Sequence, residues 1–221
     1  MGYGVKVMFW GDYALFSRPE FKVERVSYDV MTPSAARGLL EAIFWKPAIC
    51  YIIDKIHVLH PPRFMNVRRN EVSEKLGKKN CKALMEGQKN AKECLYTSQH
   101  IQQRASLLLR DVCYVIEAHF EMTAAAGQAD NPKKHYNILL RRLRNGQCYH
   151  QPYFGCREFP AKFRLLEEDE PVPQSQLVGE KDLGFMLYDM DFSDPNNISP
   201  IFFRAKMTNG IIDLHAIEKV R

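Results

Sequence analysis

The chain has 221 residues, of which 46% are hydrophobic and 26% are charged, as in ordinary folded globular proteins. Its longest apolar runs, such as residues 48–53, are too short to span a bilayer, and no small-residue cleavage site follows an apolar stretch near the N-terminus. We therefore expect a cytoplasmic protein with no membrane partner. None of the six cysteines form a pair separated by two residues, which argues against zinc-ribbon and thioredoxin-like sites.

The net charge of +5 is distributed unevenly along the chain. Residues 61–105 hold ten lysines and arginines against four glutamates, and residues 132–145 hold five with no acid. Residues 167–194, in contrast, hold nine acids and one lysine. A basic surface attracts polyphosphate through counterion release. Two separate basic segments favour a nucleic-acid partner over the alternative of a solvated surface without function.

The first 59 residues show the patterns of a strand, a helix and a second strand. Residues 4–10 alternate with the period of a half-buried strand, and residues 21–29 look extended as well. Thr32 and Pro33 are typical of a helix start, as N-cap and first helical position, and Pro47 is expected to stop that helix. Residues 48–59 are rich in β-branched and aromatic side chains, which favours a second strand.

The pattern weakens over residues 61–105, which lack a sustained apolar face. We expect a partly helical or mobile insertion with a function of its own. Strand character returns over residues 106–122. Asn131 and Pro132 then open a second helix, which Gly146 closes. Residues 156–166 form a fourth expected strand, at an edge or with a bulge because of Pro160.

This order is that of the split βαβ, ferredoxin-like (RRM-like) α+β fold, βαββαβ, with the basic insertion between its middle strands. After an acidic linker, three short strands are expected near residues 184–192, 200–207 and 211–217. Thr208-Asn209-Gly210 supplies the turn between the last two. We therefore expect a ferredoxin-like domain over residues 1–166, followed by a β-rich extension over residues 167–221 that forms a small antiparallel sheet.

Lys133, Lys134 and His135 occupy the first turn of the second expected helix. Cations there oppose the helix dipole, but the free N–H groups of a helix N-terminus also suit an anion. For a docked phosphodiester, Lys134 could stabilise charge on phosphorus and His135 could move a proton near neutral pH. The alternative is a basic surface turn with an incidental histidine. The sequence has no phosphate loop, nucleophile elbow, dinucleotide fingerprint or metal-ligand spacing, so we expect no cofactor and no metal.

Four segments together look familiar: residues 11–16 (GDYALF), 44–47 (FWKP), 134–139 (KHYNIL) and 154–158 (FGCRE). In this order and approximate spacing they resemble the CRISPR-associated fifth Cas family, subtype I-C, of the RAMP superfamily. The resemblance implies a ferredoxin-like domain with a β-rich C-terminal extension. It also implies an endoribonuclease that cuts the CRISPR precursor transcript within each repeat by 2′-hydroxyl attack, without a metal, and stays bound to the guide RNA.

The resemblance also implies a catalytic tyrosine, lysine and histidine. The lysine and histidine map onto Lys134 and His135, whereas the tyrosine position holds Phe44, which has no hydroxyl. Either that role is only to position the RNA, or another group such as Tyr13 substitutes, or the enzyme is slower. Further RNA contacts are expected from basic side chains: Lys46, Arg68, Arg69, Lys75, Lys78, Lys79, Lys82, Lys133 and Arg141.

The leading hypothesis is a repeat-specific, metal-independent endoribonuclease that also serves in a type I-C surveillance (Cascade) complex, beside backbone and large subunits. The basic insertion would then clamp the repeat hairpin. A second hypothesis is a non-catalytic scaffold that caps the 5′ end of a guide RNA; the missing hydroxyl at Phe44 supports it. A third is a general double-stranded nucleic-acid binder, which would add double-stranded DNA to the partners.

Overall fold

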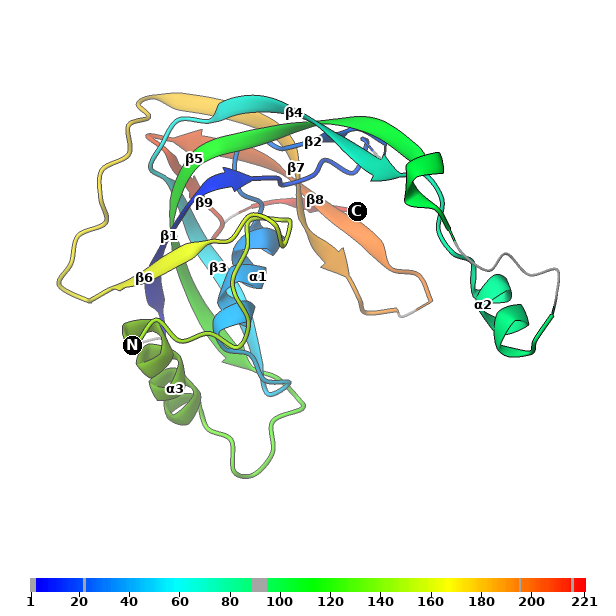
Figure 1. Cartoon of the computed structure of the whole chain (residues 1–221). Helices are drawn as coiled ribbons and strands as arrows, with labels where there is room; N and C mark the ends of the chain where they lie inside the picture. The colour runs from blue at the N-terminus through cyan, green and yellow to red at the C-terminus, as the bar shows by residue number, and fades with distance from the viewer. Residues whose placement is uncertain (1–2, 22, 89–94, 195, 216) are drawn as a thin grey trace.

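The computed structural model describes residues 3–21, 23–88, 95–194, 196–215 and 217–221, so Lys89 and Lys92 of the basic insertion lie outside the described residues. Within these ranges the chain is a mixed α and β protein dominated by an antiparallel sheet (Figure 1), as the sequence predicts at this level. None of its described helices is long and apolar enough to cross a membrane. The elements in chain order are β1 (Val5–Ala14), β2 (Arg25–Val26), α1 (Pro33–Ile43), β3 (Ile49–Val58), β4 (Arg63–Val72), α2 (Lys78–Met85), η1 (Thr97–Gln99), β5 (Ile101–Met122), α3 (Pro132–Arg144), β6 (Lys162–Leu166), β7 (Glu180–Asp191), β8 (Ser199–Thr208), β9 (Ile211–Asp213) and β10 (Lys219–Val220).

The strands form one sheet in the order β10-β8-β9-β3-β5-β1-β6; β2 and β4 also pair with β5, and β7 pairs with β8. Pairing among the described strands is antiparallel apart from a short parallel contact between β2 and β5. The C-terminal strands were expected to form a small sheet of their own. Instead, the pairing of β9 with β3 makes them a continuation of the main sheet.

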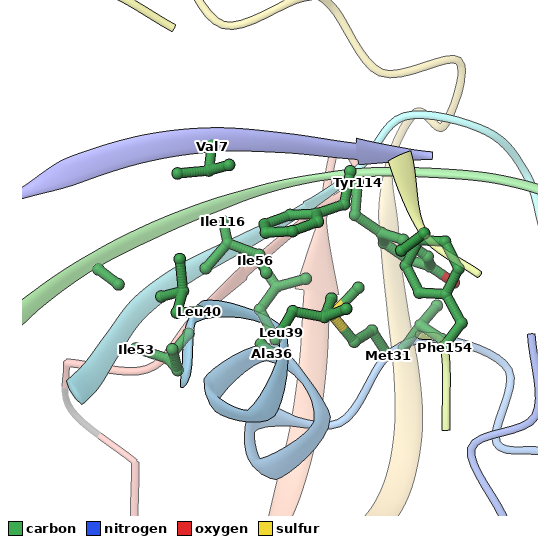
Figure 2. Close-up of a cluster of buried hydrophobic side chains, with 14 of the residues drawn as sticks. Val7, Met31, Ala36, Leu39, Leu40, Ile53, Ile56, Tyr114, Ile116 and Phe154 are labelled. Atoms are coloured by element: carbon green, nitrogen blue, oxygen red, sulfur yellow. The ribbon is translucent and has the colours of Figure 1, made fainter. Parts of the chain in front are cut away.

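Helix α1 begins where Thr32 and Pro33 predict. The Thr32 Oγ1 accepts a hydrogen bond from the Ala35 N–H at 3.3 Å, and Pro33 occupies the first helical position. The helix ends at Ile43, before Pro47 is reached, because Phe44 already adopts an extended conformation. Its apolar stripe packs on the sheet: Figure 2 shows Leu39 and Leu40 among side chains of β1, β3 and β5. Burying each such side chain stabilises the fold by about 1.5–3 kcal/mol.

The basic insertion is more regular than the sequence suggests. β4 pairs with β5 along its whole length, so the two form a long ribbon that extends from the sheet (Figure 1). α2 lies beyond the end of this ribbon and confirms that the insertion is partly helical. None of its residues is buried. β4 was missed because every residue in it is at least partly exposed, so its sequence lacks the alternation that marks a half-buried strand.

Two other local predictions concern the edge of the sheet and the last turn. The expected strand over residues 156–166 is shorter: β6 lies at the sheet edge beside β1, and before it Pro160 forms an isolated bridge to Tyr153. The turn between β8 and β9 is confirmed, because Asn209 and Gly210 have φ values of 50° and 78°. Two consecutive positive φ values are those of the type I′ hairpin turn.

Candidate active site

Helix α3 carries Lys133, Lys134 and His135 in its first turn. The Asn131 Oδ1 accepts a hydrogen bond from the Lys134 N–H at 2.8 Å, and Pro132 occupies the first helical position. The first turn contains no acid, and the side chains of Lys133 and Lys134 are exposed. The positive end of the helix dipole and the exposed Lys133 side chain therefore face solvent together, which favours a bound anion. The Lys134 Nζ, in contrast, already donates to the Ala129 carbonyl at 3.2 Å.

His135 is buried, with 2% of its surface exposed. Its Nε2 lies 3.1 Å from the Oδ1 of Asp130. A carboxylate only accepts hydrogen bonds, so the neutral ring carries its hydrogen on Nε2. The Nδ1 is then an acceptor, and it is buried without a hydrogen-bond partner among the described residues. This nitrogen is the atom of the site that can take up a proton.

Asp130 contacts both His135 and Lys134, and it was not predicted from the sequence. Its Oδ2 accepts a hydrogen bond from the Gly127 N–H at 3.0 Å, and its Oδ1 lies 3.7 Å from the Lys134 Nζ. The hydrogen bond from Gly127, with the nearby His135 and Lys134, lowers the pKa of Asp130 from its ordinary value. The side chain is thus a carboxylate at neutral pH. The only sequence signal is its place directly before the Asn131 cap.

Phe44 lies beside His135, although the two lie 91 positions apart in the sequence. The two ring centroids are 5.9 Å apart, and Phe44 is 2% exposed. The guanidinium of Arg142 lies 5.3 Å from the centroid of the same ring and donates to the Ile43 carbonyl at 2.6 Å. The position of the expected tyrosine and the Lys134-His135 pair thus belong to one site.

The other predicted RNA contacts form two groups. Three exposed side chains belong to α3 or to the segment after α1: Lys46, Lys133 and Arg141. Four exposed lysines lie on α2 or just before it: Lys75, Lys78, Lys79 and Lys82. Figure 1 places α2 and α3 on opposite sides of the molecule, so the two groups cannot contact the same phosphate.

Arg68 and Arg69 point to different faces of β4. Arg68 is exposed, whereas Arg69 is partly buried and donates from Nη1 to the carboxylate of Glu158. The Nε and Nη2 of Arg69 are buried without hydrogen-bond partners among the described residues. Of the two arginines, Arg68 is the one free to meet RNA in this conformation. No group of three or more metal-binding side chains is found in the described part of the chain.

Comparison with known proteins identifies the family. The profile described as CRISPR-associated protein (Cas_Cas5), in its Cas5d form, matches residues 4–215. The chain belongs to the Cas5 family. Two relatives named CRISPR pre-crRNA endoribonuclease Cas5d confirm the subtype. The one from Mannheimia succiniciproducens is 51% identical over 213 residues, covering 95% of this chain and 94% of the relative. The one from Thermus thermophilus is 41% identical over 229 residues, covering 96% and 91%.

Solved structures agree with this Cas5 fold. A crystal structure of a CRISPR-associated protein has a TM-score of 0.69 at 24% identity, over 96% of this chain and 92% of that one. A functionally uncharacterized protein, SMU1763c from Streptococcus mutans, has a TM-score of 0.66 at 23% identity, over the same shares of the two chains. At these identities the likeness shows the fold alone.

The four segments that carry the family resemblance meet in two pairs in this Cas5 chain. Phe44 and His135 bring together the second and third. The first and fourth meet where the Leu15 N–H donates to the Phe154 carbonyl at 3.1 Å. Gly155 has φ +79°, and a Cβ there would lie 1.9 Å from the Leu15 carbonyl oxygen, so only glycine fits. Tyr13 lies in the first segment, and its ring lies 6.1 Å from that of Phe159, which directly follows the fourth segment.

Proposed function

We propose that this chain is an endoribonuclease that cuts CRISPR precursor RNA within its repeats and needs no metal ion for the cut. The observation that carries the proposal is the buried His135 imidazole, whose Nδ1 is free to accept a proton while Asp130 holds Nε2. Such a base can deprotonate a 2′-hydroxyl that attacks a phosphodiester, and a neighbouring lysine can stabilise the charge that develops on phosphorus. The names of the two relatives, which cover nearly the whole chain, support the same activity.

In the proposed reaction, the His135 Nδ1 takes the proton of the 2′-hydroxyl as its oxygen bonds to phosphorus. The bond from phosphorus to the 5′-oxygen breaks, and that oxygen leaves with a proton from water, giving a 2′,3′-cyclic phosphate and a 5′-hydroxyl. Lys134 stabilises the extra negative charge on the phosphoryl oxygens during the attack. Because His135 is covered, RNA binding has to open a path to the imidazole.

We propose that β1, α1, β3, β5, α3 and β6 form a ferredoxin-like core over residues 1–166. The chain order βαββαβ and the sheet order β3-β5-β1-β6 support this assignment. β4 and α2 would then be the insertion between the middle strands, and β7 to β10 the extension over residues 167–221. In this scheme α3 is the second helix of the core, so the candidate catalytic pair stands on a rigid element rather than on a loop.

We propose that the exposed lysines around α2 clamp the repeat hairpin and that the protein keeps the guide RNA within a Cascade complex with backbone and large subunits. The projection of α2 beyond the sheet supports a role in reaching a large partner (Figure 1). Arg68 on β4 and Arg141 on α3 would make further contacts with the RNA.

The alternative function is a scaffold that caps the guide RNA without cutting it, which the missing hydroxyl at Phe44 favours. Labelled repeat RNA incubated with the purified protein in chelator decides between the two. Cleavage at one position within the repeat is the expected result. Tight binding without cleavage would support the scaffold and overturn the proposed nuclease.

A further inference from the structure

A cavity of about 550 Å³ opens at the C-terminal end of α1. We call it the aromatic pocket, and six of its lining side chains define it: Trp45, Lys46, Arg142, Tyr149, His150 and Tyr153. Phe44 lines it as well. Because the Phe44 ring also lies against His135, the aromatic pocket adjoins the candidate active site. Its volume is within the range of small-ligand sites.

Hydrogen bonds from the segment after α3 build the pocket. The N–H groups of Tyr149 and His150 donate to the Ala42 carbonyl at 2.9 and 3.2 Å. The His150 ring lies nearly parallel to the ring of Tyr153, at 26° and 6.3 Å between centroids. The backbone hydrogen bonds hold this wall of the pocket in place, while the Tyr149 and His150 side chains remain exposed.

Two of the rings are too exposed to serve the core. Tyr149 is 81% exposed and Trp45 is 50% exposed. Neither is a member of the hydrophobic core clusters of the described residues. Exposed aromatic faces cost free energy in water, and stacking on a planar ligand would cover them.

The charges at the aromatic pocket suit a ligand with a phosphate. Lys46 and Arg142 contribute two cations to the lining. The acid in the lining, Glu41, accepts a hydrogen bond from the Arg37 Nη1 at 2.6 Å, and Arg37 also binds Asp189, so the charge of Glu41 is partly compensated. Aromatic faces for a base next to cations for a phosphate are what proteins use to hold single-stranded nucleic acid.

We propose that the aromatic pocket binds one unstacked nucleotide of the substrate RNA, with its base on Tyr149 or Trp45 and its phosphate at Lys46. This inference rests on the proposed function for the identity of the RNA. Since Phe44 separates the pocket from His135 by a single ring, the nucleotide held there would set which phosphate reaches Lys134 and His135.

The test uses repeat RNA with 2′-fluoro sugars, which lacks the attacking hydroxyl, and carries 2-aminopurine at one position at a time. Stacking quenches the fluorescence of this base. With wild-type protein, the 2-aminopurine fluorescence should be quenched more at one position of the RNA than at its neighbours. Tyr149→Ala or Trp45→Ala should abolish that quenching and weaken RNA binding roughly 5- to 150-fold. Tyr149→Phe, which keeps the ring, should behave as wild type.

Phe185→Ala is the matched control, because Phe185 is a 58% exposed ring on β7 that does not line the pocket. Unchanged quenching in both pocket variants, an equal loss in the control, or no specifically quenched position in wild type would each overturn the inference. The readout does not depend on cleavage. A wild type that quenches one position but leaves natural repeat RNA uncut would refute the nuclease and keep the pocket.

Discussion

The carboxylate of Asp130 holds the Nε2 of His135 at 3.1 Å, which leaves Nδ1 as the acceptor of a buried imidazole. Asp130 comes from the connection after β5 and His135 from the first turn of α3. The base of the proposed reaction is therefore oriented by a residue outside the segments that resemble the family.

Replacing His135 with alanine should slow single-turnover cleavage of repeat RNA by roughly a hundred- to ten-thousand-fold, the usual value of general acid–base help. RNA affinity should stay nearly unchanged. Because His135 is buried, a thermal unfolding curve has to confirm that the variant is folded. His215→Ala, which removes an exposed histidine after β9, is the control. A folded variant that cuts within a few-fold of wild type would show that the assignment is wrong.

Asp130→Asn should keep the shape of the contact but remove the carboxylate that sets the imidazole tautomer. We expect single-turnover cleavage to fall by at least about tenfold, since an amide in this place can favour the wrong tautomer. Asp130→Glu should recover part of the loss. Equal rates for wild type and Asp130→Asn would mean that the contact does not serve the chemistry.

The pH dependence of stability gives an independent check on Asp130. Its pKa is lowered in the folded protein, chiefly by the Gly127 N–H and then by His135 and Lys134. The stabilisation is therefore present above the unfolded pKa of about 3.9 and is lost as pH falls through the folded value. Urea unfolding of wild type and Asp130→Asn at pH 7 and pH 3 should show a difference that shrinks at pH 3. A constant difference would contradict the lowered pKa.

Changing Lys75, Lys78, Lys79 and Lys82 together to glutamine should weaken RNA binding and flatten its salt dependence. Each phosphate contact contributes about 0.7–0.9 to the slope of log affinity against log salt. The comparison variant changes Lys162 and Lys206, two exposed lysines on β6 and β8. If both variants keep the wild-type slope, the lysines around α2 do not contact the RNA.

Phe44→Tyr adds a hydroxyl to a ring that already contacts His135 and lines the aromatic pocket. If this position only orients the RNA, the single-turnover rate should change by less than about tenfold, equivalent to roughly 1.4 kcal/mol of barrier. Affinity for uncleavable repeat RNA should also stay the same. A larger increase in rate would mean that a hydroxyl here acts in the chemical step and that the wild-type protein is a partly disarmed nuclease.

Local signals in the sequence were enough to place most helix ends and turns. Thr32-Pro33, Asn131-Pro132 and Asn209-Gly210 each act through backbone geometry within a few residues, so one sequence suffices to interpret them. Asp130 and the aromatic pocket could not be found this way. Both depend on which loops pack beside α3. The loop before α3 places Asp130 against His135, and the segment after α3 packs on the end of α1 to form the pocket. β4 could not be predicted for a different reason, since neither of its faces is fully buried and its sequence has no hydrophobic period.

The pairing of β9 with β3 has a consequence for synthesis on the ribosome. β3 lies inside the sheet with β5 on one side and β9 on the other, and β9 ends at Asp213. Until that residue leaves the ribosomal tunnel, the edge of β3 over residues 54–58 has free backbone groups next to an apolar surface. Such an edge is a template for pairing with another chain. Nascent chains of this protein should therefore aggregate most readily just before β9 emerges, and slow translation of residues 167–210 would lengthen that exposure.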